Sequence, residues 1–283
     1  MKNKLKILSL LCLFLISCED VIEVQTENTD KRLIIDGLIL VDPNQQTTPV
    51  AIKASISSGF FEELKPAKLS NIYLRLENGG YINLFELQPN SGIYQPSGDE
   101  VFPGEISTSI LINQKISLVL EYNGETYQAE YEYTPTVPLD NLEFGNGDLF
   151  QGDETEVKVS FTDKAGRADY YLFDFDYNNY FVSKDEFYDG QEFEFSYFYD
   201  EDLPPGEQVE VKIIGINKDF YNYMSQIIVQ SNTEFNFFQT PVATVRGNIF
   251  NVSRINNDVN LLENFPLGYF AICGFDSARI TAE

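Results

Sequence analysis

The chain has 283 residues, of which 44 are acidic and 19 are basic, so its formal net charge is −25. A surface this acidic repels phosphates and anionic headgroups, which disfavours binding to nucleic acid or to anionic headgroups through a basic footprint. The sequence contains no histidine. Because histidine is the commonest general base and the commonest zinc ligand, its absence excludes Ser-His and Cys-His catalytic pairs. What remains for catalysis is a carboxylate pair or a Lys or Tyr base, and spacing locates neither. We therefore expect no catalytic residue, no metal site and no cofactor.

The first residues are typical of an exported lipoprotein. Three lysines precede an apolar run from Ile7 to Ile16, and the small Ser17 stands before Cys18. The run is too short to cross a bilayer, for which a helix needs about 20 apolar residues, so residues 1–17 are predicted to be a cleaved signal peptide. Cys18 is then predicted to carry the lipid that anchors the mature chain in a bilayer. The alternative is a plain secretory signal in which Cys18 has no role.

Residues 18–30 are polar and acidic and are predicted to be a lipidated tether, followed by an N-terminal β-sandwich domain at residues 31–134. Runs rich in Ile, Val, Leu and Tyr, separated by Gly, Pro, Asn and Asp, indicate strands. These runs are 32–40, 49–57, 72–77, 81–86, 115–122 and 125–133. Asn123-Gly124 favours a two-residue type I′ turn between the last two. On the return strand, alternation predicts one buried face made of Tyr127, Ala129, Tyr131 and Tyr133.

Thr134 to Pro138, with two prolines in five residues, is predicted to link this domain to a C-terminal β-rich domain at residues 139–283. Its predicted strands are 156–162, 170–177, 192–198, 208–216 and 270–280, the last with a bulge or interruption at Gly274. Residues 240–267 lack periodicity and are expected to form an irregular loop or a lid.

Apolar residues at helical spacing predict a helix at about 218–230, with Asn217 or Asp219 as its cap. The sequence therefore predicts a mainly β protein with two β-sandwich-like domains, immunoglobulin-like or transthyretin-like, and one substantial helix in the C-terminal part. After loss of the signal peptide and lipidation of Cys18, only Cys273 remains, so no disulfide is expected within the chain. Cys273 lies in an apolar run and is predicted to be a core residue.

Two acidic segments were compared with calcium sites. Asp174, Asp176 and Asn178 alternate as calcium-loop ligands do, but the required glycine and glutamate are replaced by Asn179 and Asp185. A half-buried strand explains that spacing better. The second segment surrounds the turn at Pro204-Pro205-Gly206 and contains Asp200, Glu201, Asp202 and Glu207. Neither segment is assigned as a metal site.

Aromatic residues are dense between positions 170 and 199. Two interpretations stay open. Either both faces of these strands are covered by the helix and the other domain, or some rings emerge and mark a surface for a ligand or a partner.

Six segments carry a family resemblance. They are Cys18-Glu-Asp-Val-Ile-Glu23, Arg32-Leu-Ile-Ile-Asp-Gly-Leu38, Asp189-Gly-Gln-Glu-Phe-Glu194, Leu203-Pro-Pro-Gly-Glu-Gln-Val-Glu-Val-Lys212, Pro241-Val-Ala-Thr-Val-Arg-Gly-Asn-Ile249 and Phe265-Pro-Leu-Gly-Tyr-Phe270. On these, the mature chain resembles a family of Bacteroidota outer-membrane lipoproteins defined by domain of unknown function 4249. The resemblance implies no catalytic residues, because the family has none assigned.

The same resemblance implies a place in the cell and a class of partner. Acidic residues after the acylated cysteine look like a signal for display on the cell surface, which Glu19, Asp20 and Glu23 would supply. Asp276-Ser277-Ala278 resembles an acceptor motif for O-glycosylation of exported Bacteroidota proteins, so Ser277 is a candidate modification site. Such lipoproteins are often encoded beside TonB-dependent outer-membrane transporters.

The leading hypothesis is therefore a lipid-anchored protein of the outer membrane, facing the cell exterior. It would act as a non-catalytic accessory or ligand-capture subunit of an outer-membrane β-barrel. The alternative is a structural, scaffold or biogenesis component of an outer-membrane complex. A ligand-binding module should have an aromatic-lined cleft near residues 240–267, whereas a scaffold should have flat partner surfaces.

Overall fold

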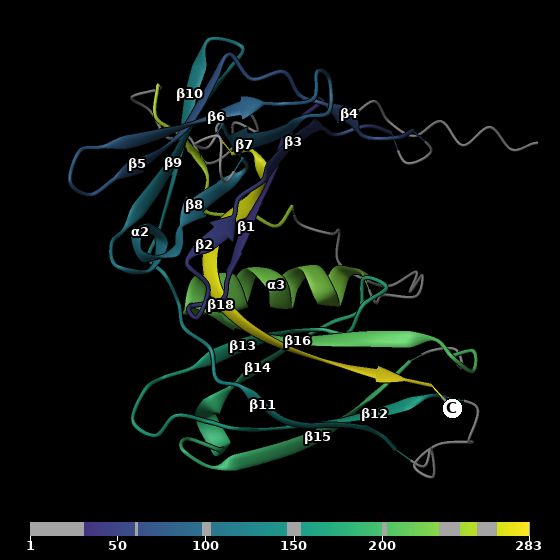
Figure 1. Cartoon of the computed structure of the whole chain (residues 1–283). Helices are drawn as coiled ribbons and strands as arrows, with labels where there is room; N and C mark the ends of the chain where they lie inside the picture. Colours follow the sequence, from purple (N-terminus) through teal and green to yellow (C-terminus); the bar gives the residue numbers. More distant parts are fainter. Residues whose placement is uncertain are drawn as a thin grey trace, which may run out of the picture. The chain divides into compact units, whose positions relative to one another are not determined.

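The structure is a computed structural model of the chain (Figure 1). It describes residues 31–59, 62–97, 103–145, 154–199, 203–231, 244–253 and 265–282. The chain divides into two compact units, residues 1–30 with 58–63 and residues 31–57 with 64–283. In the first unit, the amide of Glu62 donates a hydrogen bond of 2.9 Å to the carbonyl of Gly59. All the helices and strands described below belong to the second unit.

The second unit is mainly β and contains one substantial helix, as the sequence predicts. Most of its strands belong to one large sheet. Its first elements are β1 (Leu33–Val41), β2 (Thr47–Pro49), β3 (Ile52–Ile56), β4 (Lys65–Pro66), β5 (Asn71–Leu76), β6 (Tyr81–Glu86), β7 (Ile93–Pro96), β8 (Glu105–Ser107), α2 (Thr108–Ile112), β9 (Ile116–Tyr122) and β10 (Glu125–Tyr131). The later elements are β11 (Leu139–Phe144), β12 (Glu156–Thr162), β13 (Tyr170–Asp174), β14 (Tyr180–Lys184), the 3₁₀ turn η2 (Asp185–Phe187), β15 (Glu192–Phe198), β16 (Gln208–Ile216), α3 (Lys218–Ser231), β17 (Phe250–Asn251) and β18 (Leu267–Thr281).

Within the described residues, thirteen strands form one sheet. Its order is β14-β13-β16-β18-β1-β3-β7-β6-β5-β9-β10-β17, with β4 beside β3. A second sheet has the order β11-β12-β15, and β2 pairs with β8. The large sheet therefore combines strands from before and after the predicted linker.

The last strand, β18, connects the two parts of the large sheet, as the yellow ribbon in Figure 1 shows. It pairs in parallel with β1 from Ile34 opposite Leu267 to Val41 opposite Gly274. From Phe275 onward it pairs antiparallel with β16. The predicted bulge or interruption at Gly274 is wrong, because β18 is continuous and its register does not shift within either pairing. Gly274 is the last residue of β18 that pairs with β1, and the pairing with β16 begins at the next residue, Phe275.

Two hydrophobic clusters form the core. The second cluster lies between the β11-β12-β15 sheet and β13, β16 and β18, and includes Phe161, Tyr171 and Phe173. The first cluster contains most of the buried apolar residues described before Tyr131, together with Leu172 and Phe220 from the later part of the chain. Because the first cluster crosses the linker, the division into two sandwich domains at residues 134 and 139 stays a prediction. Cys273 is fully buried in the first cluster, which confirms its predicted core position.

The predicted helix at 218–230 is α3, at Lys218–Ser231. The side chain of Asn217 accepts a hydrogen bond of 2.9 Å from the amide of Phe220, which is the expected contact of a helix cap. Phe220 is buried, and its ring stacks on Tyr269 of β18 with 4.4 Å between centroids. The helix also packs on β13 and β14. It therefore covers one face of the large sheet (Figure 1).

Most predicted strands are confirmed, and the Asn123-Gly124 hairpin has the expected left-handed turn, with φ angles of 53° and 78°. Two predictions are corrected. The run 49–57 contains the end of β2 and all of β3 rather than one strand. β13 ends at Asp174 rather than position 177, because Asp176, Tyr177 and Asn178 all have positive φ and reverse the chain into β14.

Candidate functional site

The predicted site residues fall into two groups. Cys18, Glu19, Asp20 and Glu23 lie outside the described residues. Ser277 is described and is exposed on β18, opposite Lys212 of β16. The carboxylate of its neighbour Asp276 accepts a hydrogen bond of 2.8 Å from the amide of Leu139. Exposure keeps Ser277 accessible, and its glycosylation stays a prediction.

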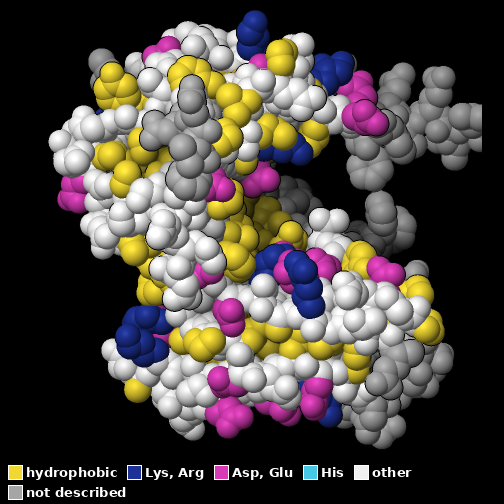
Figure 2. All heavy atoms as spheres, viewed as in Figure 1, with side chains coloured by type: hydrophobic (Ala, Val, Ile, Leu, Met, Phe, Trp, Pro, Cys, Tyr) yellow, Lys and Arg dark blue, Asp and Glu magenta, His cyan; other side chains and the backbone are white. Residues whose placement is uncertain are grey.

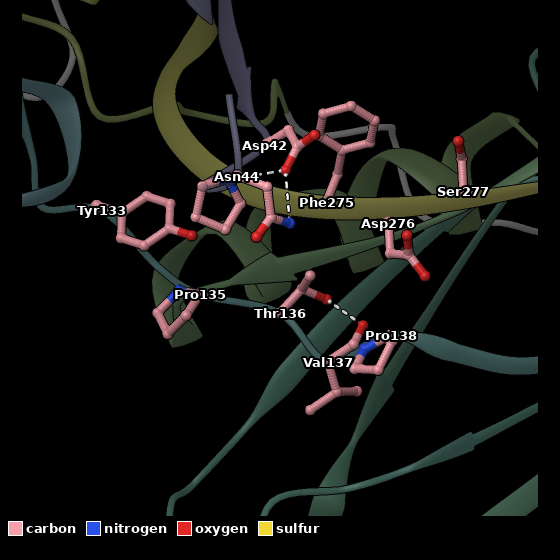
Figure 3. Close-up of a pocket in the computed structure, with 11 residues that line it drawn as sticks. Asp42, Asn44, Tyr133, Pro135, Thr136, Val137, Pro138, Phe275, Asp276 and Ser277 are labelled. Carbon is pink, nitrogen blue, oxygen red and sulfur yellow. Dashed lines mark hydrogen bonds between the residues drawn. The ribbon is translucent and has the colours of Figure 1, made fainter. Parts of the chain in front are cut away.

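A cavity of about 490 Å³ lies beside Ser277, and we call it the linker cavity (Figure 3). Three segments build it: the chain just after β1, the predicted linker, and β18 just after Gly274. Its lining residues are Asp42, Pro43, Asn44, Tyr133, Pro135, Thr136, Val137, Pro138, Phe275, Asp276 and Ser277. Because these segments are far apart in the sequence, only the pairing of β18 with both parts of the sheet brings them together.

The linker is fixed in place by β18 and β16. The amide of Thr134 donates to the carbonyl of Ile272 over 3.1 Å, and the amide of Gly274 donates to the carbonyl of Thr134 over 2.8 Å. Two glycines permit this close approach. A Cβ atom at Gly215 would lie 2.0 Å from the carbonyl oxygen of Pro135, and one at Gly274 would lie 2.6 Å from the hydroxyl of Tyr133. The cavity wall therefore depends on glycine at both positions.

The charged groups of the linker cavity are the carboxylates of Asp42 and Asp276. Oδ1 of Asp42 accepts hydrogen bonds from the backbone amide and the side-chain amide of Asn44, at 2.9 and 3.0 Å. Burial, and to a smaller extent the nearby Cys273 and Asp42, raise the pKa of Tyr133, against the opposing effect of Arg167. Figure 3 shows the Tyr133 hydroxyl pointing into the space between the segments. The tyrosine therefore stays a neutral hydroxyl at physiological pH.

A second cavity, of about 460 Å³, adjoins the first and shares Asp42 and Phe275 with it. Its other lining residues are Leu38, Leu40, Gln45, Thr47, Thr48, Pro49 and Ala51. The two cavities thus form one acidic and aromatic compartment beside one mostly apolar compartment. The sequence analysis predicted neither cavity. The Pro-rich linker could have indicated the first one, because ligand sites often lie where two parts of a chain meet.

Three carboxylates lie in the loops before β13 and after β14, beside the second hydrophobic cluster. Asp163, Asp185 and Asp189 each have an oxygen within 4.8 Å of the others. These groups also hold backbone amides, since Gly190 donates to Asp163 over 2.9 Å and Gly166 donates to Asp189 over 2.7 Å. The contacts join the two loops that flank β13 and β14.

Tyr171 is completely buried, and its hydroxyl donates to Asp163 beside the carboxylate of Asp169. Burial and these carboxylates raise the pKa of Tyr171 well above its ordinary value. Burial also raises the pKa of Asp169, although Arg167 opposes it through an ion pair. The arrangement is a buried hydrogen-bond network that orders the loops.

The first segment compared with calcium sites has other contacts. Asp174 forms an ion pair with Lys212 at 3.2 Å, and one of its oxygens accepts the amide of Asp176. Asp176 accepts the amide of Glu210 over 2.7 Å. The interpretation of this segment as a half-buried strand is corrected, since Asp176 and Asn178 lie in the turn after β13. In the second segment, Asp200, Glu201 and Asp202 lie outside the described residues.

The aromatic residues between 170 and 199 are mostly core. Tyr171, Phe173 and Phe175 are fully buried, and Phe195 packs against Phe173 with 5.0 Å between ring centroids. Other aromatic side chains of this segment are exposed to solvent, and Phe187 is 86% exposed. Exposed apolar side chains also occur on β6 and β7, at Tyr81, Phe85 and Ile93. Figure 2 shows hydrophobic patches and scattered acidic side chains on the face in view. Both interpretations of the aromatic residues therefore hold in part.

Among the described residues, no helix is long and apolar enough to cross a membrane. No curated protein matches the chain. The family model described as "Domain of unknown function (DUF4249)" matches residues 19–278, which is nearly the whole chain. The chain therefore belongs to the DUF4249 family.

Proposed function

We propose that the protein is a lipid-anchored subunit of the outer membrane, displayed on the cell exterior, that captures a ligand for a TonB-dependent β-barrel transporter. The observation that carries the anchor is the position of Cys18. It follows an apolar run and a small residue, and the family match begins at the next residue, 19. The family match thus starts where the lipidated mature chain would start. Several acyl chains on one N-terminal residue give stable anchoring.

The capture role is supported by the linker cavity and its apolar neighbour. Together they offer ligand-sized spaces with aromatic rings and hydrogen-bond acceptors in their walls, within the range of volumes typical of ligand sites. A cleft was expected near residues 240–267, but none of the described residues of that range, 244–253 and 265–267, lines either cavity. Binding in such a cavity requires no reacting group, which agrees with a non-catalytic role.

Membrane fractionation of three forms of the chain tests the anchor. The wild type should sediment with outer membranes and partition into detergent, whereas Cys18→Ala should keep its signal peptide or be released. Cys12→Ala is the matched control, since it changes a cysteine of the leader without touching the acylation site. Replacing Glu19, Asp20 and Glu23 by alanine should keep membrane association but abolish digestion by protease added to intact cells. Soluble wild-type protein would refute the anchor.

Affinity purification from detergent-solubilised outer membranes tests the partner. We expect a β-barrel transporter to co-purify with the wild type. The second candidate is a scaffold component, which the exposed Tyr81, Phe85 and Ile93 on a sheet face favour. If Phe85→Ser removes a co-purifying protein that is not a transporter, the scaffold function is supported and the transporter function is refuted.

A further inference from the structure

The charge of the linker cavity limits what it can bind. Two carboxylates, Asp42 and Asp276, line it, and the described lining includes no lysine or arginine. Two cations in neighbouring parts of the chain form ion pairs with other acids. Lys212, opposite Ser277, forms ion pairs with Asp174 and Glu210, and Arg167 pairs with Asp169. An anionic ligand would therefore meet the negative charges of Asp42 and Asp276, so this site disfavours it.

Both carboxylates are positioned by contacts to one oxygen each. Asp42 uses Oδ1 for Asn44, and Asp276 uses Oδ2 for the amide of Leu139. Among the described residues, the other oxygen of each carboxylate has no hydrogen-bond donor, so it can accept one from a ligand. Asp42 is half-buried, as is Asp276, so a charge pair formed there is screened less than one on the open surface.

Aromatic rings complete the wall. Tyr133 and Phe275 line the same cavity, and Figure 3 shows Phe275 beside Asp42. A cation within about 6 Å of a ring centroid is attracted by the negative face of the ring. The net charge of −25 adds a long-range field that draws cations toward the protein. The adjoining apolar cavity, which shares Asp42 and Phe275, can accept the carbon chain of such a ligand.

We propose that the linker cavity binds a small organic cation, an alkyl ammonium or guanidinium compound, with Asp42 and Asp276 as its counter-charges and Tyr133 and Phe275 as its walls. This inference rests on the capture role in the proposed function and specifies its ligand class. A neutral hydroxylated ligand is the competing outcome, since the carboxylates and Ser277 can also accept or donate hydrogen bonds to hydroxyl groups.

Isothermal titration calorimetry on the purified full chain in detergent tests the proposal. The probes are 1,4-diaminobutane, its neutral analogue 1,4-butanediol, and the dianion succinate. We expect saturable binding of one diamine per chain, weakened by added salt, and no binding of the diol or the dianion. Equal binding of the diol would overturn the proposal in favour of a neutral ligand, and binding of none of the three would also overturn it.

Variants separate the cavity from general adsorption to an acidic surface. Asp42→Asn and Asp276→Asn should each weaken diamine binding about tenfold or more, because each removes one charge-assisted contact. Asp140→Asn is the matched control, since Asp140 is an exposed acid outside the cavity that accepts the hydroxyl of Thr162. Ser277→Lys, which adds a competing ammonium at an exposed position, should abolish binding even if an aspartate variant folds poorly.

An equal loss of affinity in Asp140→Asn and Asp42→Asn would refute the cavity as the site. These titrations need no transporter and no membrane. If the chain is soluble in cells but binds the diamine, the proposed function is refuted and the inference is kept. If the chain is membrane-anchored but binds no diamine, the inference is refuted and the proposed anchor is kept.

Discussion

Gly215→Ala tests whether the linker is held as tightly as the structure indicates. A Cβ atom at this position would lie 2.0 Å from the carbonyl oxygen of Pro135, and contacts below 3.0 Å do not persist, so the linker must move by about 1 Å. Overpacking of this kind costs about 1–3 kcal/mol. The movement also strains the two backbone hydrogen bonds between Thr134 and β18, each worth about 1 kcal/mol. We expect a total loss of about 3 kcal/mol.

Urea denaturation followed by far-UV circular dichroism measures this loss, as a lower midpoint at an unchanged slope. Gly80→Ala is the control, because its Cβ would meet only side-chain atoms, no closer than 3.1 Å. The Gly215→Ala chain should also bind 1,4-diaminobutane more weakly than the Gly80→Ala chain, because Pro135 lines the cavity. A stability within about 0.5 kcal/mol of wild type would refute the close packing of the linker on β16.

Three further substitutions test the core, the helix cap and an ion-pair network. Phe161→Ala should cost about 3–5 kcal/mol in urea denaturation, because the fully buried ring contacts Tyr171 and three other rings, and Phe161→Leu should cost less than half of that. Asn217→Ala should cost about 1 kcal/mol through loss of the cap of α3, with Asn222→Ala on the exposed face as an unaffected control. Burial alone would raise the pKa of Glu210, but Lys212 and Arg279 outweigh it and lower that pKa below its ordinary value. Its contribution to stability is therefore present above the unfolded-state pKa and lost as pH falls through the lowered value, so Glu210→Gln should be destabilising at pH 7 and equal to wild type in strong acid.

Local patterns predicted the elements whose signals are local. Alternation on β10 placed Tyr127 and Ala129 on the buried face, and the Asn123-Gly124 turn set the hairpin. The helix followed from its apolar spacing and from Asn217. The end of β13 was predicted wrongly because three consecutive non-glycine residues, Asp176 to Asn178, take positive φ. Such a turn is energetically costly for these residues, and nothing in an aromatic-rich run indicates it. β14 was missed for this reason.

Pairings and cavities between distant segments could not be predicted. The parallel pairing of β1 with β18 joins Ile34 to Leu267, and hydrophobic periodicity does not specify the partner of a strand. The linker cavity depends on that pairing, so Asp42 and Asp276 gave no sign of lying together. By contrast, the lipidation of Cys18 is a prediction from a contiguous motif, which requires no knowledge of the fold.

The position of β18 also determines the order in which the protein can mature. β1 emerges first from any N-terminus-first synthesis or translocation, yet one of its edges stays open until a strand more than 230 residues later has arrived. Pairing over such a sequence distance is slow. During that interval the open edge of β1 leaves the chain exposed to chaperones and to aggregation. A product cut short before Leu267 would leave β1 and β16 each with an unpaired edge, so the cell would have a direct structural mark by which to degrade incomplete copies.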